Sequence, residues 1–255
     1  MEFDDDVIAC AKTVERADPE RFAAVMAAPL AARARLFPLY AFNVEAARAP
    51  WVTQESMIAE MRLQWWRDAL EEIGSGRPAR RHEVVSPLAG VLDAEGAALL
   101  VQSLEARRWD IYRDPFEDQA HLERYIEQTG GHLMLVAARL LGARQRAAAL
   151  DLGYAAGLAA FLRAVPELES RGRVPLVDGR PEAVAALARG GLARLARARA
   201  QRADVPTAAA LAAWQAGPLL RLAVAQPGRV AAGQLHLPLL RQRLRLIWQA
   251  ASGRW

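Results

Sequence analysis

The side chains best able to do chemistry in this sequence are its carboxylates, and their spacing argues against a metal site. Glu167 and Glu169 stand beside Pro166, at the expected end of a helix. Two carboxylates without a facing pair make a poor site for magnesium and a diphosphate, because magnesium demands an octahedral set of oxygen ligands. Glu123 and Glu127 are four residues apart, a spacing typical of a solvated helix surface. The carboxylates therefore predict no bound metal.

The four histidines and the single cysteine form no recognisable catalytic arrangement. His82, His121, His132 and His236 have no metal-binding spacing, and there is no GxSxG, P-loop or GxGxxG motif. Cys10 stands alone, which excludes an internal disulfide and a cysteine-based metal cluster. We expect it to lie inert in the first helix.

Three arginines are the remaining candidates for ligand binding. Arg163, Arg171 and Arg173 could meet a phosphate, since the planar fork of a guanidinium matches that anion. A basic loop that faces solvent explains the same residues equally well. Both interpretations stay open at the level of sequence.

Helices must position these side chains, and the two central helices are predicted around residues 39–67. Apolar residues at Leu36, Leu39, Tyr40 and Val44 have the spacing of a half-buried helix that ends near Pro50. A second helix is predicted to begin after Thr53, a plausible N-cap, and to carry apolar residues at Met57, Ile58, Met61, Trp65 and Trp66. The two helices are expected to face each other across a cavity, with Trp65 and Trp66 favoured as core residues over ligand platforms.

The rest of the chain also predicts helices. They cover residues 4–16, a segment from Pro19, a short stretch at Ser86-Pro87, and residues 93–112, 120–141, 147–164, 181–202, 207–225 and 237–251. Pro29 and Pro38 are expected to punctuate the run to Tyr40, and Pro166 to close a helix. No segment alternates apolar and polar residues for long, so we predict one all-α domain over residues 1–255.

Two local patterns each allow two interpretations. Gly130-Gly131 and the Gly153/Gly157 pair fit either close helix–helix approach or room for a ligand in the bundle. In the last helix, apolar residues lie beside basic ones: Leu237, Leu240, Leu244 and Ile247 beside Arg241, Arg243 and Arg245. That helix is either an ordinary amphipathic helix closing the bundle or a contact for an anionic membrane surface.

Composition narrows the function classes. The 255 residues are 53% hydrophobic with a formal charge of +4, carried almost wholly by arginine, since Lys12 is the only lysine. The arginines are scattered without interleaved aromatic residues, which argues against nucleic-acid binding. The acidic start, MEFDDD, lacks the features of a signal or transit peptide, and no apolar run is judged long enough to span a bilayer. We expect a protein of a bacterial cytoplasm.

The ordered motifs carry a resemblance. YAF, RLQWWRDAL, SPLAGVL, YIEQTGGHLMLVAARLLG and DLGYAAGLAAFLRAVPELESRGRVPL, clearest over residues 22–176, resemble the squalene and phytoene synthase family. The resemblance implies an isoprenoid-synthase helical bundle around a central cavity. It also implies head-to-head joining of two prenyl diphosphates, held through magnesium by two aspartate-rich motifs on facing helices.

The departures from the family pattern fall on those motifs. The first cluster of aspartates pairs with Ala47, Arg48 and Trp51, and the arginine before it with Val44. The second motif pairs with Ala160, Arg163, Ala164, Glu167 and Leu168, where only the arginine and the glutamate survive. Tyr125 keeps one family tyrosine, and Gln128 replaces another. Without these aspartates, and with Arg48 in place of one of them, the ordinary magnesium cluster could not assemble.

AFNVEAA, MRLQWW, YIEQT and LRAVP are similar to one branch of the family, the mitochondrial complex I assembly factors. This implies a pseudoenzyme that helps to mature a membrane-bound NADH dehydrogenase, with no metal or cofactor. A remodelled prenyltransferase, which would need Mg²⁺, is the alternative; carboxylates such as Glu45, Glu60 and Glu167 converging in the cavity would favour it.

The resemblance also implies where a ligand would bind and what the partners are. An isoprenoid or diphosphate would occupy a degenerate cavity lined by Tyr40, Asn43, Glu45, Arg62, Gln64, Tyr125, Gln128, Arg163, Glu167, Arg171 and Arg173. The other expected partners are a client protein of the membrane complex and, through peripheral contact, an anionic membrane at the inner face of the bacterial envelope; nucleic acid is not expected.

Overall fold

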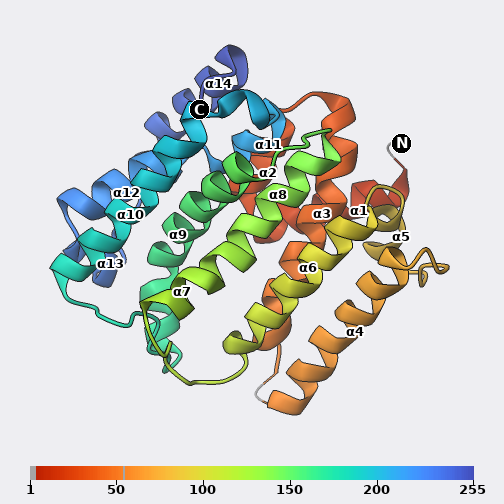
Figure 1. The fold of residues 1–255 in the computed structure, drawn as a ribbon, viewed down its shortest axis with the longest axis horizontal. Coiled ribbons are helices and arrows are strands. Elements are labelled where there is room, and N and C mark those ends of the chain that lie inside the picture. Colours follow the sequence, from red (N-terminus) through yellow and green to blue (C-terminus); the bar gives the residue numbers. More distant parts are fainter. Residues whose placement is uncertain (1–3, 54) are drawn as a thin grey trace.

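Helices form the whole architecture of the described chain. The computed structural model describes residues 4–53 and 55–255, in which there is no strand (Figure 1); the first three residues of the acidic start lie outside them. The α-helices are α1 (Asp5–Ala17), α2 (Pro19–Met26), α3 (Leu30–Arg48), α4 (Ser56–Gly74), α5 (Val85–Ala89), α6 (Ala94–Arg107), α7 (Gln119–Ile126), α8 (His132–Leu140), α9 (Ala147–Ser170), α10 (Pro181–Ala200), α11 (Thr207–Ala210), α12 (Ala216–Ala225), α13 (Gly228–Ala231) and α14 (Leu239–Ser252). Short 3-10 turns η1 (Ala49–Trp51), η2 (Arg108–Asp110), η4 (Arg202–Asp204) and η5 (Leu211–Ala213), and a π-helical turn η3 (Glu127–Gly131), complete the set.

Six of the helices pack in succession as a layer, whose last member, α12, also contacts α9. From right to left in Figure 1 they run α4, α6, α8, α9, α10 and α12, and each packs on the next. Helix α3 lies against this layer and contacts α1, α2, α5, α6 and α8. The buried apolar residues form one core that extends from Val7 to Leu235. The prediction of an all-α bundle is confirmed.

Two prolines do not end helices as the sequence predicted. Pro38 lies inside α3, which runs unbroken from Leu30 to Arg48, and Pro166 lies inside α9, which continues to Ser170. A proline within a helix removes one hydrogen bond and costs about 3 kcal/mol. Burial of the α3 side chains around Pro38, from Leu36 to Phe42, offsets that cost. The expected breaks at these prolines were wrong because tertiary packing outweighs local propensity.

The start of α4 also differs from the prediction. The helix begins at Ser56, and the Glu55 amide just before it donates a hydrogen bond to the Thr53 hydroxyl at 3.1 Å. Helices α3 and α4 meet through Phe42 and Trp66, whose rings cross edge to face with centroids 5.4 Å apart. The two helices are therefore in contact at this level, where the sequence predicted a cavity. Trp66 is a core residue, as expected.

The glycine pairs lie at a close crossing of η3 and α9. A Cβ atom on Gly153 of α9 would lie 2.5 Å from the carbonyl oxygen of Gly130 and 2.8 Å from the Cα of Gly131. A Cβ on Gly130 would in turn lie 2.8 Å from the Cα of Gly157. These distances settle the two interpretations in favour of backbone contact between η3 and α9. The glycines leave no room there for a ligand.

Two segments differ from the prediction that no apolar run is long enough to span a bilayer. By length and composition, Ala147–Ser170 and Thr207–Ala225 are apolar enough to cross a bilayer. Within the fold, 61% and 56% of their apolar windows are buried. Both segments serve as core helices of the bundle.

Candidate functional site

A buried polar network lies around Asp110, at the end of the turn that follows α6. The Tyr125 hydroxyl donates to Oδ1 of Asp110 at 2.9 Å, and Nη1 of Arg107 lies 3.6 Å from Oδ2. Arg173 donates to the carbonyl of Trp109 at 3.3 Å and to that of Asp110. All four polar side chains are largely buried, so their hydrogen bonds must be made within the protein, to one another, to the backbone or to neighbouring side chains.

The network unites three of the residues predicted from the sequence. Tyr125 and Arg173 belong to it directly, and Asn43 joins it by accepting a hydrogen bond from Nη2 of Arg107 at 3.1 Å. Burial raises the pKa of Asp110, while Arg107 and the Tyr125 hydroxyl act in the opposite direction. Arg107 and Asp110 were missed by sequence reasoning, although their spacing of three residues at a helix end is a usual ion-pair signal.

Aromatic rings fill the space next to this network. Trp109 stacks on Phe116 with centroids 4.1 Å apart, and Tyr125 packs against both Phe116 and Phe161 in edge-to-face geometry. Such pairs contribute packing energy beyond the area they bury. The polar residues of the network are therefore surrounded by closely packed aromatic side chains.

A cleft opens beside Trp51, on the outer side of the same network. Its volume is about 620 Å³, and Ser56, Tyr112 and Arg113 contribute to its walls. Arg171 and Arg173 lie over the Trp51 ring, with their guanidinium carbons 4.8 and 5.1 Å from its centroid. The cations that could meet a phosphate are therefore engaged by an aromatic face.

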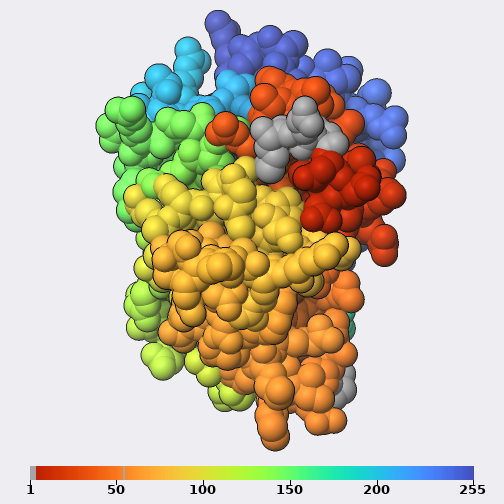
Figure 2. Space-filling model, turned by 90° about the vertical axis from the view of Figure 1, so that its right-hand side faces the viewer, coloured from red at the N-terminus to blue at the C-terminus, as the bar shows by residue number. Residues whose placement is uncertain are grey.

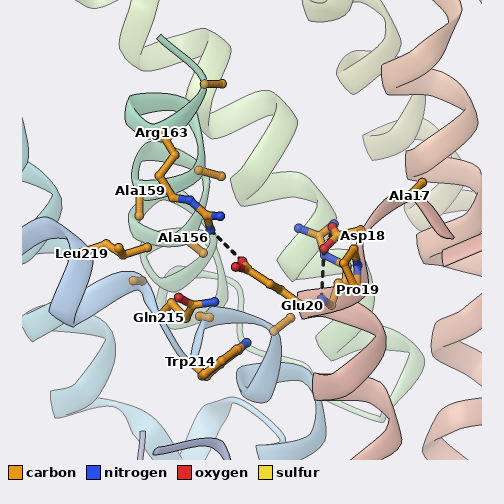
Figure 3. Close-up of a pocket in the computed structure, with 16 residues that line it drawn as sticks. Ala17, Asp18, Pro19, Glu20, Ala156, Ala159, Arg163, Trp214, Gln215 and Leu219 are labelled. Atoms are coloured by element: carbon orange, nitrogen blue, oxygen red, sulfur yellow. Dashed lines mark hydrogen bonds and ion pairs between the residues drawn. The ribbon is translucent and has the colours of Figure 1, made fainter. Parts of the chain in front are cut away.

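A second cavity, of about 430 Å³, lies between α2, α9 and the start of α12 (Figure 3). Arg163 projects into it from α9 and donates to Glu20 of α2 at 2.7 Å. Ala160 and Ala164, which pair with positions of the second aspartate motif, also line this cavity. The only carboxylates among its described lining residues are those of Asp18 and Glu20. The buried amide nitrogen of Gln215, another lining residue, has no hydrogen-bond partner.

Tyr40 lies near that cavity but is enclosed. Its side chain is 1% exposed, its hydroxyl has no hydrogen-bond partner, and Arg21 lies 4.9 Å from the ring centroid. Burial raises the pKa of Tyr40 to about 12, so the phenol stays neutral. It is therefore a packed core residue in this structure.

The glutamates that could have rebuilt a magnesium site do not converge. Glu45 pairs with Arg48 at 3.5 Å, Glu60 with Arg108 at 2.9 Å, and Glu167 with Arg171 at 2.6 Å. Each carboxylate is thus neutralised by a different arginine. Within residues 4–53 and 55–255, no three His, Cys, Asp or Glu side chains lie close enough together to hold a metal ion.

The other predicted site residues lie elsewhere. Arg62 and Gln64 are exposed on α4, and Gln64 donates to Asp68 at 2.7 Å, so their expected place in the central cavity was wrong. Both fall on the solvent side of a helix whose buried side carries Leu63 and Trp66. Gln128 lines a surface hollow of about 560 Å³ beside Tyr125, apart from the two cavities above.

Comparisons with known proteins agree with this fold. The family model described as squalene/phytoene synthase matches residues 14–242. A Drosophila melanogaster protein named "NADH dehydrogenase (ubiquinone) complex I, assembly factor 6 homolog" is 31% identical over 66% of this chain and 53% of its own length. The Homo sapiens protein named complex I, assembly factor 6, is 27% identical over 65% of this chain and 51% of its own length. The chain thus spans about half the length of the curated relatives it matches.

Solved structures show the same architecture. A dehydrosqualene synthase in complex with ligand superposes with a TM-score of 0.77 at 17% identity, covering 97% of this chain and 96% of that one. The squalene synthase HpnC from Alicyclobacillus acidocaldarius gives a TM-score of 0.72 at 14% identity, covering 87% and 94%. Identities this low establish the isoprenoid-synthase fold and nothing about activity.

Proposed function

The chain belongs to the squalene/phytoene synthase family, and from that premise we propose that it is a non-catalytic member which serves as an assembly or scaffold factor for a membrane-bound NADH dehydrogenase. The names of the Drosophila and human relatives support the direction of the proposal. The observation that carries it is the surroundings of Trp51, which the sequence comparison pairs with an aspartate of the family: Arg171 and Arg173 lie over its ring.

Electrostatics explain why that observation weighs against catalysis. A magnesium–diphosphate cluster needs several carboxylates in one place, because the metal ions and the substrate are all highly charged. Around Trp51 the charged groups of the cleft are Arg113, Arg171 and Arg173. The positions paired with the two aspartate motifs also open to different cavities, Trp51 to one and Ala160 to the other. Bound metal ions would therefore meet repulsion where the family has attraction.

The assembly role is tested by deleting the gene in its source organism. We expect less fully assembled NADH dehydrogenase on native gels and a matching loss of NADH oxidation by isolated membranes, with succinate oxidation unchanged as the control. The wild-type gene supplied in trans should restore both. Normal assembly in the deletion strain would refute the role, and an equal loss of succinate oxidation would indicate a general respiratory defect.

The cavity between α2 and α9 is the place where this protein would keep a lipid. Half of its lining residues are alanines, and the polar groups include the Arg163–Glu20 pair and the unpaired amide of Gln215. That lining suits an isoprenoid with a polar end group. We place the protein on the cytoplasmic side of a bacterial membrane, beside the complex that it helps to assemble.

Prenyl transfer through a remodelled site is the second candidate, and membership of the squalene/phytoene synthase family favours it. Calorimetry with a non-hydrolysable prenyl diphosphate decides between the two. We expect no magnesium-dependent binding, since no carboxylate cluster is present in the described chain. Magnesium-dependent binding, or a C30 or C40 product from farnesyl or geranylgeranyl diphosphate, would contradict the non-catalytic proposal. Binding that ignores magnesium would mean that arginines alone hold the ligand, and Arg163→Ala would then weaken it.

A further inference from the structure

Helix α14 turns its apolar side outward. Leu240, Leu244 and Ile247 are 69%, 58% and 65% exposed, and Trp248 extends the same stripe. The side that faces the bundle is mixed: Leu246 and Ala250 are partly buried against the core, Gln249 is buried, and Arg245 donates from Nε to the Trp214 carbonyl at 2.6 Å. A helix that merely closes a bundle has the opposite arrangement. The apolar face of Leu240, Leu244 and Ile247 therefore does not close the bundle, as the first of the two interpretations required.

Positive charge surrounds this stripe. From Val205 to Trp255 the chain has no aspartate or glutamate and has six arginines: Arg221, Arg229, Arg241, Arg243, Arg245 and Arg254. At 3.6 residues per turn, Arg241 and Arg243 fall on opposite borders of the stripe centred on Leu244. Both are exposed, and within the described residues neither makes an ion pair.

More arginines lie on the inner side of α14. Arg199 donates to the carbonyl of Trp255 at 3.0 Å. Burial lowers the pKa of Arg245, and the neighbouring cations Arg199 and Arg221 lower it further. Arg199, Arg221 and Arg245 thus place further positive charge beneath the helix, which adds to the attraction of this end of the molecule for an anionic surface.

We propose that α14 binds peripherally to an anionic lipid bilayer, with Leu240, Leu244, Ile247 and Trp248 inserted among the headgroups and Arg241 and Arg243 paired with lipid phosphates. Basic borders around an apolar stripe, with a tryptophan at its edge, are the signature of a helix that lies in a membrane interface. Two copies of the chain could not pair here without bringing these arginines together. The inference does not depend on the identity of any client protein.

The position of α14 in the molecule fits this orientation. The helix lies at the upper rim in Figures 1 and 2, at the opposite end from the start of α4. The bundle contacts it mainly through η5, on the inner side of the helix. The stripe can therefore meet a flat surface without any rearrangement of the core.

Vesicle flotation of the full chain tests the proposal. We expect the protein to float with phosphatidylcholine vesicles that contain phosphatidylglycerol, to stay behind with pure phosphatidylcholine, and to detach as salt is raised, because salt screens the arginines. Leu244→Glu/Ile247→Glu should weaken binding about tenfold or more. Arg241→Gln/Arg243→Gln should remove about tenfold of the preference for anionic vesicles.

The matched control places the same charges at the other end of the molecule. Met57 and Met61 of α4 are 73% and 65% exposed, so Met57→Glu/Met61→Glu alters a comparable apolar surface. It should leave flotation unchanged, and thermal melts should show every variant folded. The proposal fails if the wild type does not bind anionic vesicles, or if both double glutamate variants bind equally. A lipid-free dimer that Leu244→Glu/Ile247→Glu dissociates would also overturn it, by assigning the stripe to a second copy.

Discussion

Replacing Gly153 with alanine is expected to lower the free energy of unfolding by about 3 kcal/mol. The new Cβ would lie 2.5 Å from both the Gly130 carbonyl oxygen and the Met134 Cβ, and 2.8 Å from the Gly131 Cα. Two of these neighbours are backbone atoms of the facing segment, so no side-chain rotation can make room. The two helical segments must move apart, and side chains packed between α8 and α9 lose part of their contacts. Chemical denaturation followed by circular dichroism measures the loss.

Gly190 provides the matched control for this substitution. It also lies inside a long helix, α10, but a Cβ there would meet nothing within 4 Å. Gly190→Ala should therefore be neutral or should stabilise the protein by up to about 1 kcal/mol, the helix-propensity difference. If both alanine variants unfold at the same denaturant concentration, the backbone contact between η3 and α9 at Gly153 would be contradicted.

Replacing Arg173 with methionine is expected to cost about 3 kcal/mol of stability. The side chain is 8% exposed and donates to the carbonyls of Trp109 and Asp110, beside a buried carboxylate. Methionine keeps most of the volume but leaves two buried acceptors unpaired and removes a positive charge near Asp110. The loss should appear in equilibrium unfolding at neutral pH.

Arg171→Met tests whether burial is the reason. Arg171 lies over the same Trp51 ring, but it is exposed and pairs with Glu167 at the surface, so its loss should cost less than about 1 kcal/mol. Equal losses at the two positions would contradict a buried network.

The Arg173→Met deficit should also depend on pH. Burial raises the pKa of Asp110 in the folded protein above that of an unfolded aspartate. The protonated carboxyl group therefore stabilises the fold fully at a pH below the unfolded pKa. This contribution is lost as the pH rises through the folded pKa. Without Arg173 that pKa rises further. The two proteins should therefore be most alike in acid and diverge as pH increases. A deficit that is constant with pH would show that Asp110 is not involved.

The sequence determined the class of fold because its signals are local. Apolar residues recur at helical spacing from Leu36 to Val44, and turn residues such as Gly142 fall at helix ends. The same signals failed at Pro38 and Pro166, where α3 and α9 continue through the proline. Whether a helix survives an internal proline depends on how much surface its neighbours bury, and no local pattern contains that information.

For the candidate site, the sequence indicated which residue types were missing, and only the tertiary structure decided what those that remain do. The absence of aspartates near Ala47 and Ala160 can be read directly. The convergence of Asn43, Tyr125 and Arg173 on Asp110 brings together residues far apart in the chain. The outward apolar face of α14 was equally undecided, because periodicity defines a stripe but not the side of the helix that meets the protein. Long-range packing decided both: the buried network fixed the first, and the burial of Gln249 with the bond from Arg245 to Trp214 fixed the second.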